Sequence, residues 1–162
     1  VLEQYKGKNI FCYFVGDDKN NSYTQKFFKK IKDKKLDSMC KILGQLSQED
    51  LRMMYICSDV IISAPLKPEG FCRVIGEGLA MKKIVLSYNY GGAKEQLDDL
   101  DSIFKIVPND QIDLKNKIDK VFKLSNSHKS KIGSIARDHI INNFSKEKML
   151  NKYLNFYKRV IL

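Results

Sequence analysis

The strongest constraint on the fold is an alternation between short apolar runs and longer segments with helical spacing. The apolar runs predict strands at residues 8–15, 40–43, 59–64, 83–87 and 103–107. Helices are predicted at residues 22–33, from Ser47 onward, and at 71–81, 95–97, 112–124, 130–142 and 145–162. Because the strands are apolar throughout rather than alternating with polar residues, they predict a parallel sheet with helices on both faces. The fold class is therefore α/β with a helical C-terminal tail.

The chain has no internal repeat, low-complexity tract or linker, and its 162 residues fit one domain. We expect a single domain over residues 1–162, in which residues 127–162 form the terminal helices. Residues 1–6 have the pattern of a helix end. We therefore expect the domain to be truncated at its N-terminal edge, with one strand missing before Val1.

The chain carries 29 Lys and Arg against 19 Asp and Glu, a net charge of +10. This surplus fits a solvated, lysine-rich surface, and it also fits attraction to an anionic membrane. Nucleic acid is not expected as a partner, because the excess is mostly Lys and does not interleave with aromatic residues. No apolar run approaches the roughly 18 residues of a membrane span, and no segment has the pattern of a signal peptide. The expected location is the cytoplasm, with peripheral contact to the inner face of the membrane as an option.

The four cysteines, Cys12, Cys40, Cys57 and Cys72, are scattered, without a C-x-x-C pair or a neighbouring His. This spacing predicts neither a metal site nor a disulfide framework, and we expect reduced thiols packed as small apolar groups.

The loop after the predicted strand at 59–64 has the residues of an anion-binding site. In doubly wound sheets, ligands bind beyond the carboxyl ends of the strands, where helix N-termini face outward. Gly70 lets the backbone approach a ligand without a Cβ between them. The helix predicted at 71–81 would open with three free amides that point toward an anion, those of Phe71, Cys72 and Arg73.

Two acids flank this helix start, Glu69 just before it and Glu77 about two turns later. The other side of the helix is expected to carry Val74, Leu79 and Met81. An ionised carboxylate accepts hydrogen bonds from two adjacent hydroxyls, which hexoses and ribose both offer. The arrangement predicts a nucleotide-sugar, with the hexose at Glu69, the diphosphate at the amides and the ribose at Glu77. The alternative is that Glu69 is a solvated loop acid and Glu77 a surface residue paired with Lys.

Residues 68–80 resemble the E-x7-E motif of the family 4 (group 1) retaining glycosyltransferases, and the resemblance extends along most of residues 10–157. The motif positions that match are Pro68, Glu69, Gly70, Phe71, Val74, Glu77 and Ala80. Four further segments resemble the family pattern at the family spacing: FVGD at 14–17, the segment from Leu43-Gly44 to Ser58-Asp59-Val60, NYGGAKE at 89–95, and Val107-Pro108.

This resemblance implies the C-terminal, Rossmann-like half of a GT-B glycosyltransferase, which binds the nucleotide-sugar donor without a metal or other cofactor. It assigns the donor sugar to Glu69, as a catalytic residue, and the ribose to Glu77. The sugar and phosphates are assigned to Gly70, Phe71, Cys72 and Arg73, and the base to the backbone of Gly44, Gln45 and Leu46.

The chain also departs from the family pattern. Cys72 stands where Gly is usual, which slightly hinders backbone approach while leaving amide donation intact. The family's Arg and Lys that grip the diphosphate lie on a strand and loop that would precede Val1. Arg73 either assists at the phosphates or points to solvent. The histidines of the terminal helices are expected to have no chemical role, and the tyrosines near Gly91-Gly92 to pack rather than bind: His128, His139, Tyr88 and Tyr90.

The expected activity is transfer of a hexosyl group, with retention, from a UDP- or GDP-sugar to a glycan or lipid-linked acceptor. The resemblance places this in cell-surface polysaccharide or lipopolysaccharide synthesis. The acceptor would be held through an N-terminal domain that is missing here, so residues 1–162 alone are expected to be inactive. The alternatives are a sugar-nucleotide epimerase, a non-catalytic nucleotide-binding module and a basic nucleic-acid-binding module.

Overall fold

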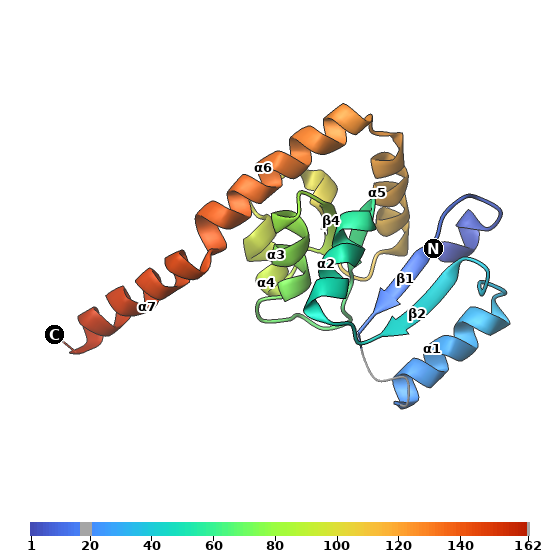
Figure 1. Ribbon diagram of the computed structural model, residues 1–162, viewed down its shortest axis with the longest axis horizontal. Helices are drawn as coiled ribbons and strands as arrows, with labels where there is room; N and C mark the ends of the chain where they lie inside the picture. The colour runs from blue at the N-terminus through green and yellow to red at the C-terminus, as the bar shows by residue number, and fades with distance from the viewer. Residues whose placement is uncertain (17–20, 162) are drawn as a thin grey trace. The chain divides into compact units, whose positions relative to one another are not determined.

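The computed structural model describes residues 1–16 and 21–161, and the chain divides into two compact units, Val1–Met54 and Tyr55–Leu162. Each unit contains its own parallel sheet (Figure 1). We call them the N-terminal and the C-terminal unit and describe each by itself. The α/β fold class is confirmed, with parallel strands, covering helices and a helical C-terminal end. The expectation of a single domain over residues 1–162 stays a prediction.

The N-terminal unit is a two-stranded parallel sheet with a helix against one face. Its elements are η1 (Leu2–Tyr5), β1 (Cys12–Val15), α1 (Ser22–Asp33), β2 (Cys40–Gly44) and the first part of α2 (Gln48–Cys57). Cys12 lies opposite Cys40 in the ladder, and Phe14 lies opposite Ile42. The Phe14 ring packs edge-on against Phe27 of α1, with ring centroids 4.7 Å apart.

Local chemistry explains where these elements begin and end. The Asn21 side chain accepts a hydrogen bond from the Thr24 amide at 2.7 Å, which caps α1 at the predicted residue. The strand predicted at 8–15 is shorter, because the Ile10 amide donates to the Lys8 carbonyl and closes a turn there. The predicted helix end at residues 1–6 is one 3-10 turn. Asp17 and Asp18, which we expected in the turn after this strand, lie outside the described residues.

The C-terminal unit is a three-stranded parallel sheet in the order β3-β4-β5, surrounded by helices (Figure 1). Its elements are β3 (Val60–Ser63), α3 (Arg73–Ala80), β4 (Ile84–Tyr88), α4 (Gly91–Leu97), η2 (Ser102–Phe104), β5 (Lys105–Ile106), α5 (Gln111–Lys123), α6 (Asn126–Phe144) and α7 (Lys146–Ile161). Every residue of the central strand β4 is buried, as its continuous apolar sequence predicts.

Two glycines allow the helices of this unit to pack closely. A Cβ on Gly78 of α3 would lie 2.8 Å from Ile61 and 2.7 Å from Val85, so α3 rests directly on β3 and β4. A Cβ on Gly133 of α6 would lie 2.2 Å from the Lys82 carbonyl oxygen. These contacts fix α3, and with it the loop that precedes α3, against the sheet.

The predicted element types hold in this unit, but several boundaries move. The helix predicted at 71–81 begins at Arg73. The helix predicted at 130–142 is the 19-residue α6, which starts earlier because Ser125 accepts from the His128 amide and caps it. The strand predicted at 103–107 is reduced to β5, because residues 102–104 form a 3-10 turn.

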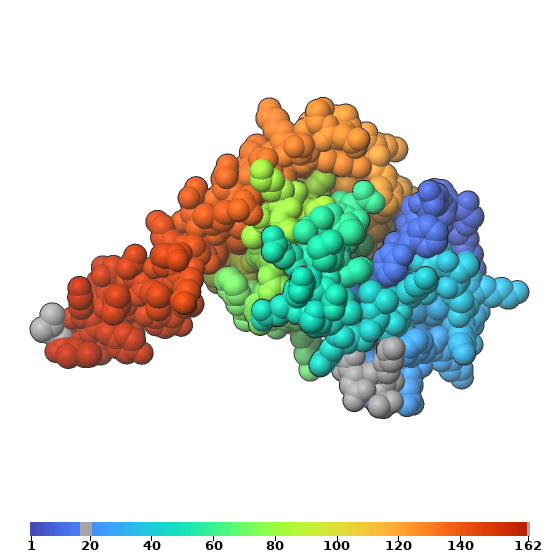
Figure 2. Space-filling model, in the orientation of Figure 1, coloured from blue at the N-terminus to red at the C-terminus, as the bar shows by residue number. Residues whose placement is uncertain are grey.

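Helix α7 extends away from the other helices of its unit, and none of its residues is buried (Figure 2). Over the part of the chain that the structure describes, no helix is long and apolar enough to cross a membrane. All four cysteines are free thiols, and Cys57 is the exposed one.

Candidate functional site

The loop between β3 and α3 carries most of the predicted site residues, and its backbone lies directly against the start of α4. The Gly92 amide donates to the Glu69 carbonyl oxygen at 2.9 Å. A Cβ on Gly92 would come within 1.8 Å of the Gly70 carbonyl oxygen, so only glycine fits there. Gly91 has a φ of +55° and also touches the Glu69 backbone. The two glycines therefore set the position of the loop.

This packing decides which way the loop amides point. The peptide unit is planar and trans, so its carbonyl and the following amide point in opposite directions. The carbonyls of Glu69 and Gly70 face α4, and the amides of Gly70 and Phe71 consequently face away from it. No group in residues 1–16 or 21–161 accepts a hydrogen bond from the amides at 71–74. These outward donors are suited to an anionic ligand.

Cys72 ends the loop in a left-handed conformation, with φ 47° and ψ 76°, which corrects the predicted helix start at Phe71. A non-glycine residue in this conformation is strained, and a helix cannot run through it. The Cys72 Sγ lies 3.2 Å from Ser63 Oγ on β3, so the side chain is turned inward. Burial raises the pKa of the Cys72 thiol, and the Glu69 carboxylate raises it further, against the opposing hydrogen bond from Ser63. Cys72 thus keeps the backbone that the family builds with Gly, without placing its side chain in front of the amides.

Glu77 lies on α3, and each of its carboxylate oxygens already has one partner. The Tyr55 hydroxyl donates to Oε2 at 2.9 Å, and Arg73 Nη2 donates to Oε1 at 3.0 Å. Burial and the hydrogen bond to Glu77 raise the pKa of Tyr55, so the phenol stays protonated. A carboxylate offers about four acceptor positions, so about two remain for a ligand. The partner of Glu77 is therefore not the Lys of the alternative interpretation.

Two details of α3 differ from the sequence prediction. Arg73 neither stands free nor faces a phosphate, because it forms the i,i+4 ion pair with Glu77 while its side chain stays 78% exposed. Such an exposed pair contributes little to stability, so Arg73 is available to a ligand at small cost. Val74 is exposed rather than on the apolar side, and the buried face of α3 consists of Ile75, Gly78 and Leu79.

Glu69 is exposed at the top of the loop, where the structure gives its carboxylate only weak ties to protein. It contacts Cys72 as described above, and its charge contributes, after desolvation and Tyr88, to raising the pKa of Tyr90. The Tyr90 hydroxyl donates to the Pro65 carbonyl, which fixes the start of the loop, while Tyr88 is buried. Glu69 is thus free to meet a ligand.

Two hollows occur in the described residues, and neither is the loop itself. The first, of about 280 Å³, lies in the C-terminal unit between α3 and α6 and is mainly apolar. It is lined by Phe71, Arg73, Gly76, Glu77, Ala80, Ile140, Ile141, Phe144 and Ser145. It therefore borders the predicted site on the side of Arg73 and Glu77.

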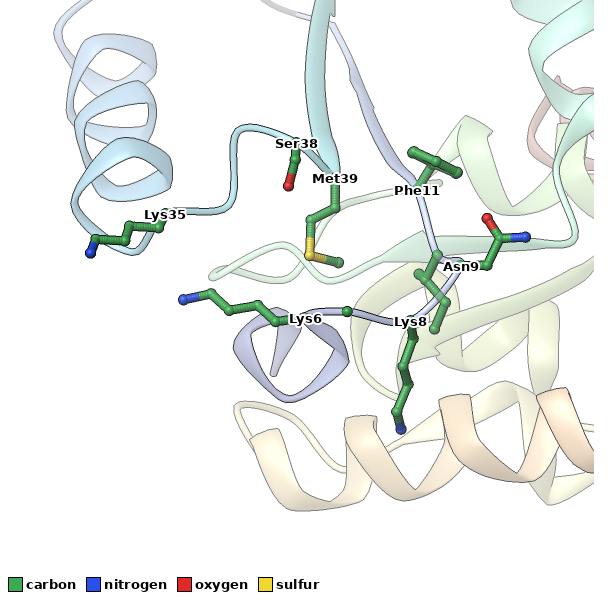
Figure 3. A pocket seen from close by; sticks show the side chains of 9 residues that line it. Lys6, Lys8, Asn9, Phe11, Lys35, Ser38 and Met39 are labelled. Atoms are coloured by element: carbon green, nitrogen blue, oxygen red, sulfur yellow. The ribbon is translucent and has the colours of Figure 1, made fainter.

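The second hollow, of about 590 Å³, lies in the N-terminal unit at the amino ends of β1 and β2. Figure 3 shows Lys6, Lys8 and Lys35 around it, with Met39 between the strands. Ligands of doubly wound sheets bind at the opposite, carboxyl ends. We assign no function to this hollow.

The residues predicted to hold the base, Gly44, Gln45 and Leu46, follow β2 in the N-terminal unit, so they are described apart from the loop. Gly44 has a φ of +74° and its carbonyl accepts from the Gly16 amide at 2.9 Å, while Gln45 is exposed. This backbone turn fits contact through the main chain. The roles of all site residues stay predictions.

Two residues of the site escaped the sequence analysis as functional groups. Tyr55 belongs to a segment that resembles the family pattern, but nothing in the sequence pairs it with Glu77. Gln96 is fully buried on α4 and reaches the Phe71 carbonyl. A lone Gln on the apolar face of a predicted helix was its only signal.

No three His, Cys, Asp or Glu side chains cluster as metal ligands would within the described ranges. The expectation of a donor site without metal stays a prediction.

A family model described as "Glycosyl transferases group 1" matches residues 1–139 of the chain. The chain belongs to the group 1 glycosyltransferases. No curated protein matches it.

Solved structures of glycosyltransferases share this fold. A glycosyltransferase from Rickettsia africae ESF-5 is 38% identical, with a TM-score of 0.89, and the match covers 99% of this chain and 42% of that one. Anabaena HepE, in a structure with UDP, is 22% identical, with a TM-score of 0.83 over 98% of this chain and 43% of its own. Sucrose-phosphate synthase from Thermosynechococcus elongatus is 18% identical, with a TM-score of 0.79 over 92% of this chain and 38% of its own. The chain therefore spans less than half the length of these proteins.

Proposed function

We propose that this chain is the donor-binding part of a retaining family 4 hexosyltransferase that uses a nucleotide-sugar. The observation that carries the proposal is the β3–α3 loop, whose amides face outward next to a free Glu69. Glu77 adds a carboxylate that Tyr55 and Arg73 orient and that keeps open acceptor positions. Diphosphate, hexose and ribose each have a matching group.

A UDP-sugar is the donor that we favour. HepE shares the fold at a TM-score of 0.83, and its structures contain UDP and UDP-glucose. The base would be held by the backbone of Gly44, Gln45 and Leu46, which leaves a GDP-sugar as the alternative. The experiment below includes both.

The proposed reaction breaks the bond between the anomeric carbon and the diphosphate oxygen. The electron pair leaves with the diphosphate, whose negative charge the loop amides stabilise, and the acceptor oxygen bonds to the anomeric carbon as its hydroxyl loses a proton. Positive charge develops on the sugar ring in the transition state, and a carboxylate at Glu69 is then most favourable.

The acceptor is proposed to be a glycan or a lipid-linked sugar in cell-surface polysaccharide or lipopolysaccharide synthesis, in the cytoplasm. This rests on the family and on helix α7, whose polar side is basic and whose apolar side is exposed. A helix of this kind fits peripheral contact with an anionic membrane. Since the match covers less than half of each solved relative, we expect the acceptor to be held elsewhere and residues 1–162 alone not to catalyse transfer.

The test is calorimetric titration of the protein with UDP, GDP and UDP-glucose, for the wild type, Glu69→Gln and Glu77→Gln. We expect saturable binding of UDP and UDP-glucose. Glu77→Gln should weaken both by roughly tenfold, because charge-assisted bonds to the ribose are lost. Glu69→Gln should leave UDP affinity unchanged, because UDP has no hexose, and should strongly lower turnover in the full-length enzyme. Glu49→Gln, an exposed acid on α2, is the matched control.

Two results would contradict the proposal. A wild type that binds no nucleotide would remove the donor site. Equal effects of Glu69→Gln and Glu77→Gln on UDP affinity would remove the division of roles between the two acids.

A further inference from the structure

Gln96 is a polar residue at a position of α4 where the packing calls for an apolar one. Its side chain is fully buried, and its neighbours on the same face, Ala93 and Leu97, are buried too. Burying an amide without full hydrogen bonding costs stability, so a Gln in this place needs a compensating role.

The Gln96 side chain is only half satisfied. Its Nε2 donates to the Phe71 carbonyl and lies 3.5 Å from the Cys72 carbonyl oxygen, whereas its Oε1 is buried without a partner. The nitrogen must face the loop, because both groups that it meets there are acceptors. A leucine would avoid the unpaired oxygen, so stability alone does not explain this residue.

The consequence of these contacts lies in the loop. Because peptide units are planar, carbonyls of Phe71 and Cys72 drawn toward α4 turn the amides of Cys72 and Arg73 the opposite way. Gly92 already directs the preceding carbonyls inward, and Gln96 continues this pattern up to the first residue of α3. We propose that Gln96 is a positioning residue, which holds these amides toward the diphosphate of the donor. The inference rests on the proposed donor-binding function.

Gln96 is itself held in place from two sides. The Nε2 of His139 on α6 donates to its backbone carbonyl at 3.0 Å. On α3, Gly76 leaves room for the side chain, since a Cβ there would lie 3.2 Å from Gln96 Oε1. Helices α3, α4 and α6 therefore meet at the carboxamide that reaches the loop.

The test compares Gln96→Met, which keeps the length of the side chain and removes the donor, with the wild type. We expect faster amide hydrogen exchange at residues 71–74 in the unliganded protein, and UDP-glucose affinity lower by about two- to tenfold, the range of one hydrogen bond. The thermal midpoint should change little, because the unpaired Oε1 is removed together with the bond. Leu97→Ala, on the same buried face, is the control: it should lower the midpoint and leave both loop exchange and affinity unchanged.

Each readout can fail separately. Unchanged exchange at residues 71–74 in Gln96→Met would overturn the positioning role, and so would parallel changes in Gln96→Met and Leu97→Ala. If the wild type binds no UDP-glucose, the donor-binding proposal fails instead, while hydrogen exchange still decides whether Gln96 orders the loop.

Discussion

Glu77 is oriented before any ligand arrives, since Tyr55 and Arg73 each donate to one of its oxygens. Tyr55 is the stronger of the two positioning groups, because it is buried and fixed, whereas Arg73 is largely exposed. The orientation of a ribose-binding carboxylate thus depends on a residue 22 positions earlier in the chain.

Replacing Tyr55 by Phe tests this orientation. The change removes one buried hydrogen bond to a carboxylate, so we expect a loss of about 1 kcal/mol in the free energy of unfolding. UDP affinity should fall several-fold, by about 1 kcal/mol or less, because Glu77 is no longer held. Tyr153→Phe, on the exposed face of α7, is the control for urea unfolding and calorimetry. An unchanged UDP affinity in Tyr55→Phe would show that Glu77 does not need this partner.

The same pair of proteins has a defined pH dependence. The pKa of Tyr55 is raised in the folded protein above its ordinary value of 10.0. Its contribution is therefore complete below pH 10.0 and is lost as the pH rises through the folded pKa, because the unfolded phenol ionises first. The stability advantage of the wild type over Tyr55→Phe should narrow above pH 10.0 and stay constant below it.

At the scale of elements, the loop after β3 is shaped by α4 rather than by its own sequence. Gly92→Ala would place a Cβ 1.8 Å from the Gly70 oxygen, so the loop must move, at a cost of roughly 1–3 kcal/mol. We expect weaker UDP-glucose binding as well. Gly133→Ala, with a comparable clash against Lys82, should cost similar stability and leave the loop amides in place. Calorimetry and thermal unfolding of the two variants separate these effects, and equal binding losses would contradict our view of the loop.

Gly70→Ala is the complementary change within the same prediction. A Cβ there has nothing within 4 Å, so stability should be unchanged. If a ligand approaches the loop backbone at this point, UDP-glucose affinity should fall nevertheless.

The elements that the sequence predicted well are those whose limits depend on local chemistry. Helix α1 ends where predicted because Asn21 caps it, and β4 is found because it is apolar throughout. The start of α3 was wrong by two residues, because Cys72 adopts its left-handed conformation with the help of Ser63, nine residues away. The motif located the loop, but the direction of its amides depends on contacts with α4 that no local pattern encodes.

At the scale of the whole molecule, the net charge of +10 and the exposed helix α7 raise the same question. At 100° per residue, its apolar residues fall on one arc of roughly 160°: Met149, Leu150, Tyr153, Leu154, Phe156, Tyr157, Val160 and Ile161. The opposite arc holds one acid against four basic residues: Glu147 against Lys148, Lys152, Lys158 and Arg159. This combination is typical of helices that lie in the interface of an anionic bilayer.

The corresponding prediction is that the protein sediments with vesicles of phosphatidylcholine and phosphatidylglycerol, and not with phosphatidylcholine alone. Binding should weaken with salt, because the basic arc acts through screened attraction of about 1 kcal/mol per charge. Leu150→Asp and Asn151→Asp make the same change of charge on opposite sides of α7, where every residue is exposed, so both variants should fold. Leu150→Asp should abolish sedimentation and Asn151→Asp only reduce it, because only the first places a charge in the apolar arc. Equal losses would indicate simple charge attraction without insertion, and a wild type that stays in the supernatant would assign the apolar arc of α7 to a protein partner.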